Sequence, residues 1–572
     1  MKVSKIFSLL FVILTLQLQA QNYQWAKNIG TDLGAGIYPS NIAVDQNGNV
    51  FVAGRFDGTV DFDPGAGLVQ VTSAGSTDIF FSKFDANGNF LWAKTIGSSM
   101  SEICWAMKLD ALGNIIIAGY YGDVTDFDPG NGTSNLSCNG SEDCFIATYT
   151  NDGNYVWANG FGAQGLDQIS KMDIDGTGNI YVAGFFQGIV DFDPGSGSSE
   201  LTALNVGPTG YNLFFAKYSS NGNYFWANQI PTSSTQICIA TDNAGNAFVA
   251  GEFSNTNSNP IDFDPGNGSA NLLATGAGDI FFSRYDAAGN YVYAYAMGGT
   301  SFQADLDKAT DVDVDNNGNV YLCGIFGSTT DFDPGTGNVS FTSVGSGDMF
   351  FAKYNFNGNY LWAHSFQSDD YAALNIHLDA NNDVLISGSF YGTTDFDPGS
   401  GMAELISNGN QDLFFAKYDN NGNYLSAAGT GFIYGDDITS DITTDNAGNI
   451  YVTGTFVDSA DFDMTASNAV LHSAVSFGQD LFLAKYTSGP VSIEIYNSEN
   501  ATLKVSPNPT DGIINVKISN ETGCYYFITN LIGEVIKKGI LTNGYYRIDM
   551  RENQKGIYFL NMEGQVAKII IK

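Results

Sequence analysis

The chain has 572 residues, which exceeds what one hydrophobic core supports, so several domains or a repeat array are expected. Its 67 glycines and 14% aromatic residues favour strands and tight turns over long helices. With 60 acidic and 23 basic residues the formal net charge is −37, which argues against nucleic acid and anionic lipid as partners.

The N-terminus predicts a signal peptide over residues 1–20. Lys2 and Lys5 precede an apolar run from Ile6 to Leu16, and small residues around Ala20 suit cleavage there. The run is too short for a bilayer span, and no later stretch is long and apolar enough for one. We therefore expect a mature chain without a transmembrane segment.

The motif DFDPG then recurs at intervals of 64 to 71 residues, and a shortened version, DFDM, begins at Asp461. Each unit has four apolar segments, which in the first copy are NIAVD (41–45), NVFVAGRF (49–56), DIFFSKFD (78–85) and NFLWAK (89–94). Turns such as DQNGN and DANGN separate them, with Asp or Asn as the capping side chain and Gly at positive φ. These patterns predict four antiparallel strands per unit.

Four strands repeated seven times match the blades of a β-propeller. YQWAKNIG, residues 23–30, resembles FLWAKTIG, residues 90–97, although no unit precedes it, and the last unit lacks its own fourth strand. The N-terminal strand is therefore predicted to complete the last blade. The expected fold class is all-β, with a seven-bladed β-propeller over residues 21–488 closed by the N-terminal strand.

The runs D-x-x-G-N-V-Y-V-A-G-x-F and D-x-F-F-A-K-Y-D-x-N-G-N-Y-L-W-A resemble the β-propeller repeat called SBBP, which is found in secreted bacterial proteins. The resemblance covers about residues 23–486. It implies a propeller scaffold and no single shared activity.

Charge changes abruptly near residue 500. Residues 21–500 contain 12 basic and 54 acidic residues, whereas residues 501–572 contain 9 and 6. We expect a linker at 489–501 and a separate domain at 502–572, with alternating strands that suggest a small Ig-like β-sandwich.

This tail resembles the C-terminal sorting domain of the type IX secretion system. The matching residues are Pro507, Asn508, Pro509, Gly533, Gly556, Tyr558 and Lys568. The resemblance implies the type IX secretion machinery as a partner, and a protein that is secreted or held on the outer-membrane surface of a Gram-negative bacterium. A further adhesive module is the rival interpretation of the tail.

In an extended DFDPG segment the two carboxylates share one face and Phe takes the other. We expect mainly a buried corner with a Pro-Gly turn, and weak calcium sites as the alternative, because carboxylates beside turn carbonyls suit Ca²⁺. Calcium is thus the one candidate cofactor. The candidate ligands are Asp61, Asp63, Asp126, Asp128, Asp191, Asp193, Asp262, Asp264, Asp331, Asp333, Asp395 and Asp397.

One position of the FFAKY segment holds six of the 12 basic residues in the acidic region: Lys83, Lys217, Arg284, Lys353, Lys417 and Lys485. An acid opens the same segment: Asp78, Asp143, Asp279, Asp348, Asp412 and Asp480. Each cation is predicted to pair with an Asp of a neighbouring strand or blade. Cys138 and Cys144 flank a short loop, and either a disulfide or two free thiols fit.

No catalytic residues are assigned. His364, His377 and His472 follow no metal-ligand spacing, and no GxSxG, HExxH or P-loop motif occurs. The recurring tryptophans fit packing between blades, and the off-pattern Trp105 is the aromatic residue to test for ligand contact. We expect a non-enzymatic binding or scaffolding module for glycan or protein. A carbohydrate-active lyase or hydrolase and a structural envelope protein are the alternatives.

Overall fold

The computed structural model describes residues 21–488 and 504–571, each range with short gaps. The gaps are residues 32–34, 204–209, 256–258, 300–306, 345–346, 368–373, 408–409, 432–434, 464–468, 475–477, 507–509, 511–512, 519–523, 531–534, 542–543, 552, 554 and 563–564. The expected signal peptide and linker lie outside the described residues. The chain divides into two compact units, Met1–Gly489 and Pro490–Lys572.

The larger unit is built from strands, and no helix occurs within its described ranges. Apart from short hairpins, its described strands form seven antiparallel four-stranded arrangements, called here sheet 1 to sheet 7. Sheet 1 contains β2 (Gly36–Val44), β3 (Val50–Asp57), β6 (Asp78–Phe84) and β7 (Phe90–Ile96). Sheet 2 contains β8 (Glu102–Leu109), β9 (Ile115–Tyr121), β12 (Asp143–Tyr149) and β13 (Tyr155–Phe161). Sheet 3 contains β14 (Gln168–Ile174), β15 (Ile180–Phe186), β18 (Asn212–Tyr218) and β19 (Tyr224–Ile230).

The remaining sheets repeat this order. Sheet 4 contains β20 (Ile237–Thr241), β21 (Ala247–Phe253), β24 (Asp279–Tyr285) and β25 (Tyr291–Met297). Sheet 5 contains β26 (Lys308–Val314), β27 (Val320–Phe326), β30 (Asp348–Tyr354) and β31 (Tyr360–Phe366). Sheet 6 contains β32 (Asn375–Leu378), β33 (Val384–Phe390), β36 (Asp412–Tyr418) and β37 (Tyr424–Thr430). Sheet 7 contains β38 (Ile438–Thr444), β39 (Ile450–Val457), β42 (Gln479–Ser488) and β1 (Gln21–Thr31).

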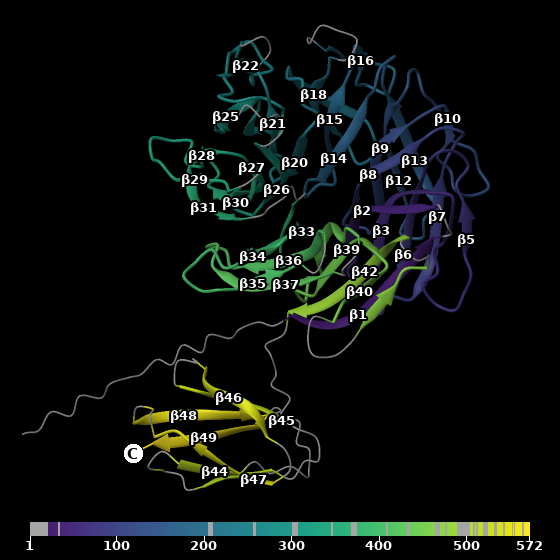
Figure 1. Ribbon diagram of the computed structural model, residues 1–572. Coiled ribbons are helices and arrows are strands. Elements are labelled where there is room, and N and C mark those ends of the chain that lie inside the picture. The colour runs from purple at the N-terminus through teal and green to yellow at the C-terminus, as the bar shows by residue number, and fades with distance from the viewer. Residues whose placement is uncertain are drawn as a thin grey trace, which may run out of the picture. The chain divides into compact units, whose positions relative to one another are not determined.

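A short hairpin, called here an arm, follows the second strand of each sheet. The arms are β4 (Thr59–Asp61) with β5 (Gln70–Thr72), β10 (Val124–Asp126) with β11 (Asn135–Ser137), β16 (Ile189–Asp191) with β17 (Glu200–Thr202), β22 (Ile261–Asp262) with β23 (Asn271–Leu272), β28 (Thr329–Asp331) with β29 (Ser340–Thr342), β34 (Thr393–Asp395) with β35 (Glu404–Ile406), and β40 (Ser459–Asp461) with β41 (Val470–His472). Figure 1 shows the arms outside the sheets that they interrupt.

The expected turn chemistry is confirmed where the strands join. Asp45 Oδ1 accepts hydrogen bonds from the backbone N–H groups of Asn47 and Asn49, each at 2.9 Å, and Asp45 Oδ2 accepts one from the Asn49 side chain. Gly48 has φ +78°, which a residue with a Cβ rarely adopts. Asp85 likewise accepts hydrogen bonds from Asn87 and Asn89, so one local pattern makes both hairpins of the sheet.

The first strand of the chain completes the last sheet. β1 pairs antiparallel with β42, with Asn28 opposite Phe482 and Ile29 opposite Leu481. Beyond that pairing, Gly30 and Thr31 pair with β4, so β1 also joins sheet 7 to the first arm. Figure 1 shows the purple β1 beside the yellow-green β42. Strands more than 450 residues apart in sequence are therefore neighbours.

The core of the larger unit lies between the sheets. Seven clusters of buried hydrophobic residues each join two sheets that follow one another, and one of the seven joins sheet 7 to sheet 1. In that cluster Val52 of β3 lies with Leu481 and Leu483 of β42, all at 0% exposure. Packing is thus continuous from each sheet to the next.

A tryptophan on the outermost strand also contacts the next sheet. Trp157 of sheet 2 donates its indole N–H to the Ser220 carbonyl of sheet 3 at 3.2 Å, and its rings lie against Gly222. A Cβ on Gly222 would lie 2.9 Å from the Trp157 ring, and φ there is +78°, so glycine fits on both counts. The expected packing role of these tryptophans is confirmed.

The smaller unit has two sheets. One contains β43 (Lys504–Ser506), β44 (Ile513–Ile518) and β47 (Gly544–Asp549), and the other contains β45 (Cys524–Thr529), β46 (Val535–Leu541), β48 (Gly556–Met562) and β49 (Gln565–Ile571). Both sheets supply residues to one buried cluster, including Ile514, Val516, Ile528 and Leu560, each at 0% exposure. This unit therefore has a hydrophobic core of its own.

Candidate functional site

The DFDPG motif forms the corner at the tip of each arm. Asp61 Oδ1 accepts hydrogen bonds from the N–H groups of Asp63, at 3.2 Å, and Val69, at 2.8 Å, while Phe62 is fully buried. Asp63 Oδ1 accepts the Gly65 N–H at 2.8 Å. One oxygen of each carboxylate is therefore used to fold the corner, as the architectural interpretation expects.

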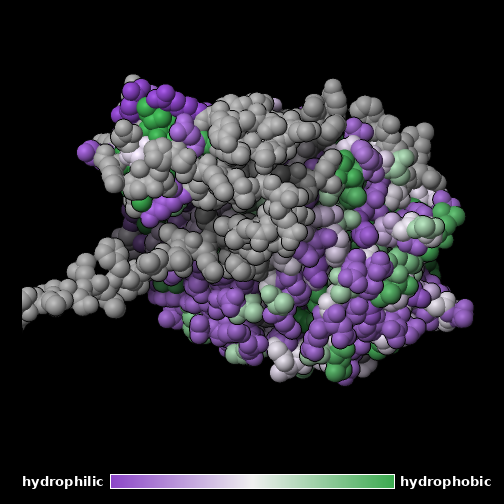
Figure 2. Space-filling model, turned by 90° about the horizontal axis from the view of Figure 1, so that it is seen from below, coloured by the Kyte–Doolittle hydropathy of each residue, from purple (hydrophilic) through white to green (hydrophobic). Residues whose placement is uncertain are grey.

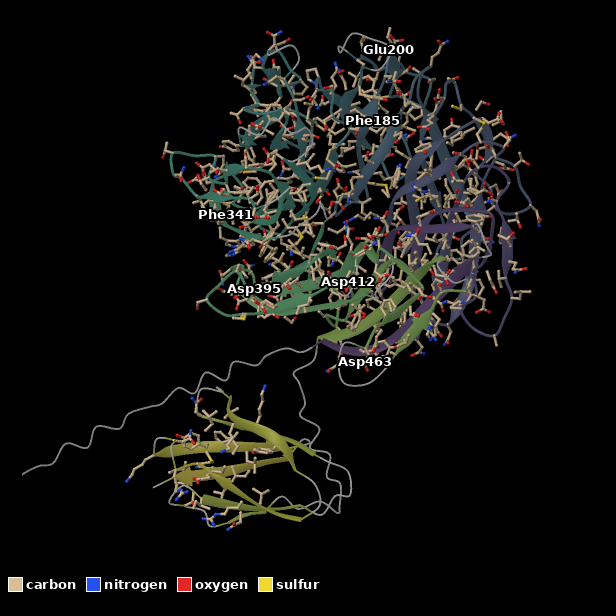
Figure 3. All side chains as sticks on the ribbon, in the orientation of Figure 1. Phe185, Glu200, Phe341, Asp395, Asp412 and Asp463 are labelled. Atoms are coloured by element: carbon tan, nitrogen blue, oxygen red, sulfur yellow. The ribbon has the colours of Figure 1, made fainter. Side chains whose placement is uncertain are left out.

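A tyrosine of the third strand secures most of these corners. Tyr149 Oη donates to the carbonyl of Phe127, and Tyr218 Oη donates to that of Phe192, both at 2.9 Å. The same bond occurs in the four following repeats, whereas Phe84 replaces the tyrosine in the first. Figure 3 shows Asp395 on an outlying arm and Asp412 further in, within its sheet.

The candidate calcium ligands come together only in pairs. The first Asp of each pair ends an arm strand and the second lies two residues on, so the pairs of different repeats belong to separate arms. Two of the corners line grooves of about 300 Å³ against the preceding sheet, one with Asp61, Asp63 and Asn28, the other with Asp262 and Asp264. No group of three or more His, Cys, Asp or Glu residues suited to a metal occurs in the described ranges. Calcium at the corners stays a prediction.

The prediction that the strand cations pair with Asp is correct for two of six. Lys217 lies 3.6 Å from Asp175, and Lys417 lies 2.8 Å from Asp379, in both cases within one sheet. Lys83 instead donates to the side chain and carbonyl of Asn151 in the turn of the next sheet. Lys353 does the same with Asn420, Arg284 bonds Asn246 and Phe356, and Lys485 reaches the Ala86 carbonyl.

An aromatic ring lies beside most of the strand cations, including Lys217, which also pairs with Asp175. The Lys83 Nζ lies 5.0 Å from the Phe51 ring centre, and the Lys353 Nζ lies 4.7 Å from that of Tyr321. A cation over an aromatic ring that also donates to a carbonyl needs no carboxylate. The acid that opens the strand has a separate role, because Asp78 accepts the N–H of Ala74 at 2.9 Å and thereby holds the loop before the strand.

The innermost strands of the seven sheets surround a cavity of about 140 Å³, called here the channel. Its lining breaks the repeat. One set of equivalent positions lines the cavity with Asn41, Ala106, Lys171, Asp311 and Asp441, and holds Cys238 and Asn375 in the two sheets where this position is not part of the lining. A second set lines it with Ala43, Lys108, Asp173, Ala240, Asp313, His377 and Thr443. Between these sets every strand keeps an aliphatic residue or methionine, such as Ile42 or Met107, which packs between sheets.

Ion pairs join different sheets along the channel lining. Lys108 Nζ lies 3.3 Å from Asp173, and Lys171 Nζ lies 3.0 Å from Asp311, two sheets further on. Asp441 of sheet 7 accepts the Ile42 N–H of sheet 1 at 3.0 Å. The channel therefore combines a charged lining with bonds between sheets.

Burial changes the acidity of the channel side chains. It raises the pKa of Asp313 to about 7 and raises that of Asp441. The carboxylate of Asp173 raises the pKa of Lys108, so that ion pair persists at neutral pH. Burial lowers the pKa of His377 to about 4, and its Nε2 lies 3.0 Å from the Thr444 hydroxyl. His377 is consequently neutral at physiological pH.

Of the channel residues, only His377 was considered from the sequence, and no role was assigned to it. The available signal was the alternation within the first strand of each repeat, where apolar positions recur and the positions between them change from Ala to Lys, Asp or His. The other two histidines pack in the fold: the His364 ring lies 5.3 Å from that of Trp362, centre to centre, and His472 Nδ1 lies 2.9 Å from Ser459 Oγ. Trp105 lies beneath the Arg55 guanidinium, at 5.1 Å from its ring centre.

The disulfide alternative for Cys138 and Cys144 is wrong, because both are free thiols. Cys144 is fully buried on the central strand β12, and Cys138 lies beyond the end of the arm with its Sγ near the Gly140 carbonyl. Each thiol therefore has its own surroundings.

The predicted sorting residues are described in part. Gly556, Tyr558 and Lys568 lie on β48 and β49, with Tyr558 buried and Lys568 exposed. Pro507, Asn508, Pro509 and Gly533 lie outside the described residues.

The described surface is largely hydrophilic. Figure 2 shows one side with hydrophobic residues in separate small groups. The exposed hydrophobic residues include single residues at one position of the outermost strand, such as Leu91, Val156 and Phe225, which are 48%, 49% and 53% exposed. No helix in the described part of the chain has the length and hydropathy to cross a bilayer.

These features define an all-β repeat protein with a separate terminal unit. The β-propeller repeat family, SBBP, matches residues 24–58, and the secretion system C-terminal sorting domain family matches residues 504–572. The chain thus contains an SBBP repeat and a sorting domain of the kind found in type IX secretion, which indicates secretion or display on the outer-membrane surface.

The chain is also similar to individual proteins. It is 27% identical over 443 residues to an uncharacterized WD repeat-containing protein, L264, of Acanthamoeba polyphaga mimivirus, covering 66% of this chain and 31% of that protein. The Pan2 WD40 domain of Neurospora crassa aligns at 10% identity with a TM-score of 0.36, covering 81% of this chain and 97% of that chain. PorZ, described as a surface component of the type IX secretion system of Porphyromonas gingivalis, aligns at 11% identity with a TM-score of 0.15, covering 96% of this chain and 100% of that chain.

Proposed function

We propose that residues 21–488 form a seven-bladed β-propeller closed by its N-terminal strand, and that this propeller is an exported binding or scaffolding module. The pairing of β1 with β42 and the hydrophobic cluster between sheets 7 and 1 support closure. Closure removes the two free edges that an open stack of sheets would expose between its first and last members. The smaller unit, proposed as an Ig-like sandwich, serves as the sorting tail for the type IX machinery.

One observation supports the binding assignment: the positions that stabilise the fold are alike in most sheets, whereas the positions around the channel differ. In nearly every sheet, the corners, turns, tryptophans and strand cations make contacts that stabilise the fold. In contrast, the two sets of channel positions differ from sheet to sheet and place Lys108, Lys171 and His377 among four carboxylates. Variation concentrated around a channel, within a repeat that is otherwise largely kept, is what a scaffold with a binding face requires.

The ligand is proposed to be a glycan or a protein. The acidic balance of residues 21–500, with 54 acidic and 12 basic residues, favours neutral or cationic partners over polyanions. The sorting tail supports a location where such polymers are met, at the cell surface or beyond it.

A glycan array combined with a reducing-end assay on residues 21–490 tests this function. We expect binding without release of new reducing ends. Turnover would replace the proposal by a carbohydrate-active enzyme. If neither glycans nor surface proteins bind, the structural envelope role is the better assignment.

A further inference from the structure

A second break in the repeat lies where sheets 1 and 2 meet. The second strand of each sheet contains a glycine followed by one variable residue and then Phe or Tyr. From sheet 1 to sheet 7 the variable residue is Arg55, Tyr120, Phe185, Glu252, Ile325, Ser389 and Thr455. Arg55 is the one cation in this set, and Tyr38 lies opposite it on β2. The Arg55 Cζ lies 4.9 Å from the centre of the Tyr38 ring.

Trp105 is also an exception at its position. It occupies a β-bulge on β8, and the bulges of sheets 1, 3, 5 and 7 hold Ser40, Ser170, Thr310 and Ser440. Ser40 Oγ donates to the Cys104 carbonyl of the next sheet at 2.7 Å, and Thr310 Oγ1 donates to that of Leu374 at 2.8 Å. Trp105 has no hydroxyl group to make this hydrogen bond between sheets. Its ring lies under Arg55 and adds an aromatic surface at this position.

The Arg55 guanidinium has no acceptor of its own in the described ranges, where no carboxylate oxygen lies within 4.0 Å of it and no hydrogen bond from it is found. The other arginine of the larger unit, Arg284, bonds Asn246 Oδ1 and the Phe356 carbonyl, each at 3.3 Å. Arg55, Tyr38 and Trp105 are all half-buried. Two rings thus hold a planar cation while its N–H donors stay available, which suits bidentate binding of a carboxylate.

Charge limits the ligand to an isolated anion. Burial and the carboxylates of Glu142 and Glu102 raise the pKa of Tyr120, which is beside this site, and the Arg55 guanidinium lowers it. These acids, and the acidic excess of the whole unit, would repel a polyanion. The rings of Tyr38 and Trp105 supply apolar surface that suits the C–H face of a sugar.

We propose that Arg55, Trp105 and Tyr38 form a subsite for a single uronic acid residue within an otherwise neutral glycan. Arg55 binds the carboxylate, and the aromatic pair contacts the sugar ring. This inference rests on the proposed binding function and names the ligand class at one place on the propeller.

Calorimetric titration of the full chain with methyl glucuronide and methyl glucoside tests the subsite, because these probes share a ring and differ in the carboxylate. We expect glucuronide to bind and glucoside to bind at least tenfold more weakly. Arg55→Gln and Trp105→Ser should each weaken glucuronide binding at least tenfold, and Arg55→Lys by less. Serine occupies the same bulge in three other sheets, so Trp105→Ser is compatible with the fold. Lys308→Gln, which removes a cation at the position in sheet 5 that corresponds to Tyr38, is the matched control and should bind normally.

Equal binding of the two probes, or full affinity in Arg55→Gln, would overturn the proposal. Equal affinity for a short peptide with a free C-terminal carboxylate would assign the subsite to an acidic peptide and overturn the saccharide. A glycan array distinguishes failure of the subsite from failure of the proposed binding function. If Arg55→Gln keeps the wild-type binding pattern, the subsite proposal is wrong and the binding function stands. If the wild-type chain binds no glycan, the binding function itself is wrong.

Discussion

Trp25 of β1 donates its indole N–H to the carbonyl of Ala86 in sheet 1, at 3.2 Å. Trp157 and Ser220 make the same bond between sheets 2 and 3, at the same distance. The contact between the strand near the N-terminus and sheet 1 is therefore of the same kind as the contacts between sheets that follow one another in sequence.

A first prediction concerns the strand that joins the two ends. Ile29 is fully buried in the cluster between sheets 7 and 1, so Ile29→Ala should lower the free energy of unfolding by about 2–5 kcal/mol. Gln24 on the same strand is exposed, and Gln24→Ala should change it by less than about 0.5 kcal/mol. Urea unfolding followed by fluorescence measures both. Equal effects would show that β1 does not hold the first and last sheets together.

A second prediction concerns the bond between strand and corner. Tyr218→Phe removes the donor to the Phe192 carbonyl and leaves that buried oxygen without its partner, which should cost about 1–2 kcal/mol. The fold accommodates phenylalanine here, since Phe84 occupies the position in the first repeat. Tyr391 is 42% exposed, so Tyr391→Phe serves as the control and should be neutral. No loss of stability in Tyr218→Phe would mean that the corner does not depend on this hydroxyl.

The pH dependence of stability follows from buried carboxyls. Burial raises the pKa of Asp167 and Asp313 to about 7 and that of Asp307 to about 6, against about 3.9 in an unfolded chain. A carboxyl with a raised pKa in the folded state favours folding when protonated, so its contribution is lost as pH rises from about 4 to about 7. His377, with its pKa lowered to about 4, acts in the opposite direction between about pH 6.5 and 4.

Because the carboxyls outnumber this histidine, the melting temperature should be higher at about pH 5.5 than at about pH 8. Calorimetry at several pH values measures this, and Asp313→Asn should reduce the slope. Asp152 is exposed, so Asp152→Asn removes the same charge and should leave the slope unchanged. A melting temperature that rises from pH 5.5 to 8 would contradict the assigned shifts.

The role of the corner acids can be separated from calcium binding. Asp61 accepts two backbone N–H groups and Asp63 accepts one, so Asp61→Ala should cost about 2 kcal/mol and Asp63→Ala less. If the corners are architectural, melting in the presence of a chelator should match melting in the presence of calcium. A lower midpoint with chelator, lost in Asp61→Ala, would instead assign calcium to the corner.

Much of the fold could be predicted because it is encoded locally and repeated. Asp45, Asn49 and Gly48 make their turn among themselves, and Phe62 is buried by the alternation of its own segment. The candidate site was harder to predict, because contacts such as Lys83 with Asn151 or Lys171 with Asp311 depend on how separate sheets are packed. The sequence shows that a cation recurs at one strand position, but the packing of the sheets determines whether it meets a carboxylate of its own sheet, as Lys217 does, or an amide of the next sheet, as Lys83 does.

The pairing of β1 with β42 has a kinetic consequence. Strand β1 cannot form its hydrogen bonds with β42 until residues 479–488 have been synthesised. Joining ends some 450 residues apart costs about 2 kcal/mol more chain entropy than joining neighbouring repeats. We therefore expect the pairing of β1 with β42 to form later than the pairings within sheets 1 to 6, which join strands close together in sequence.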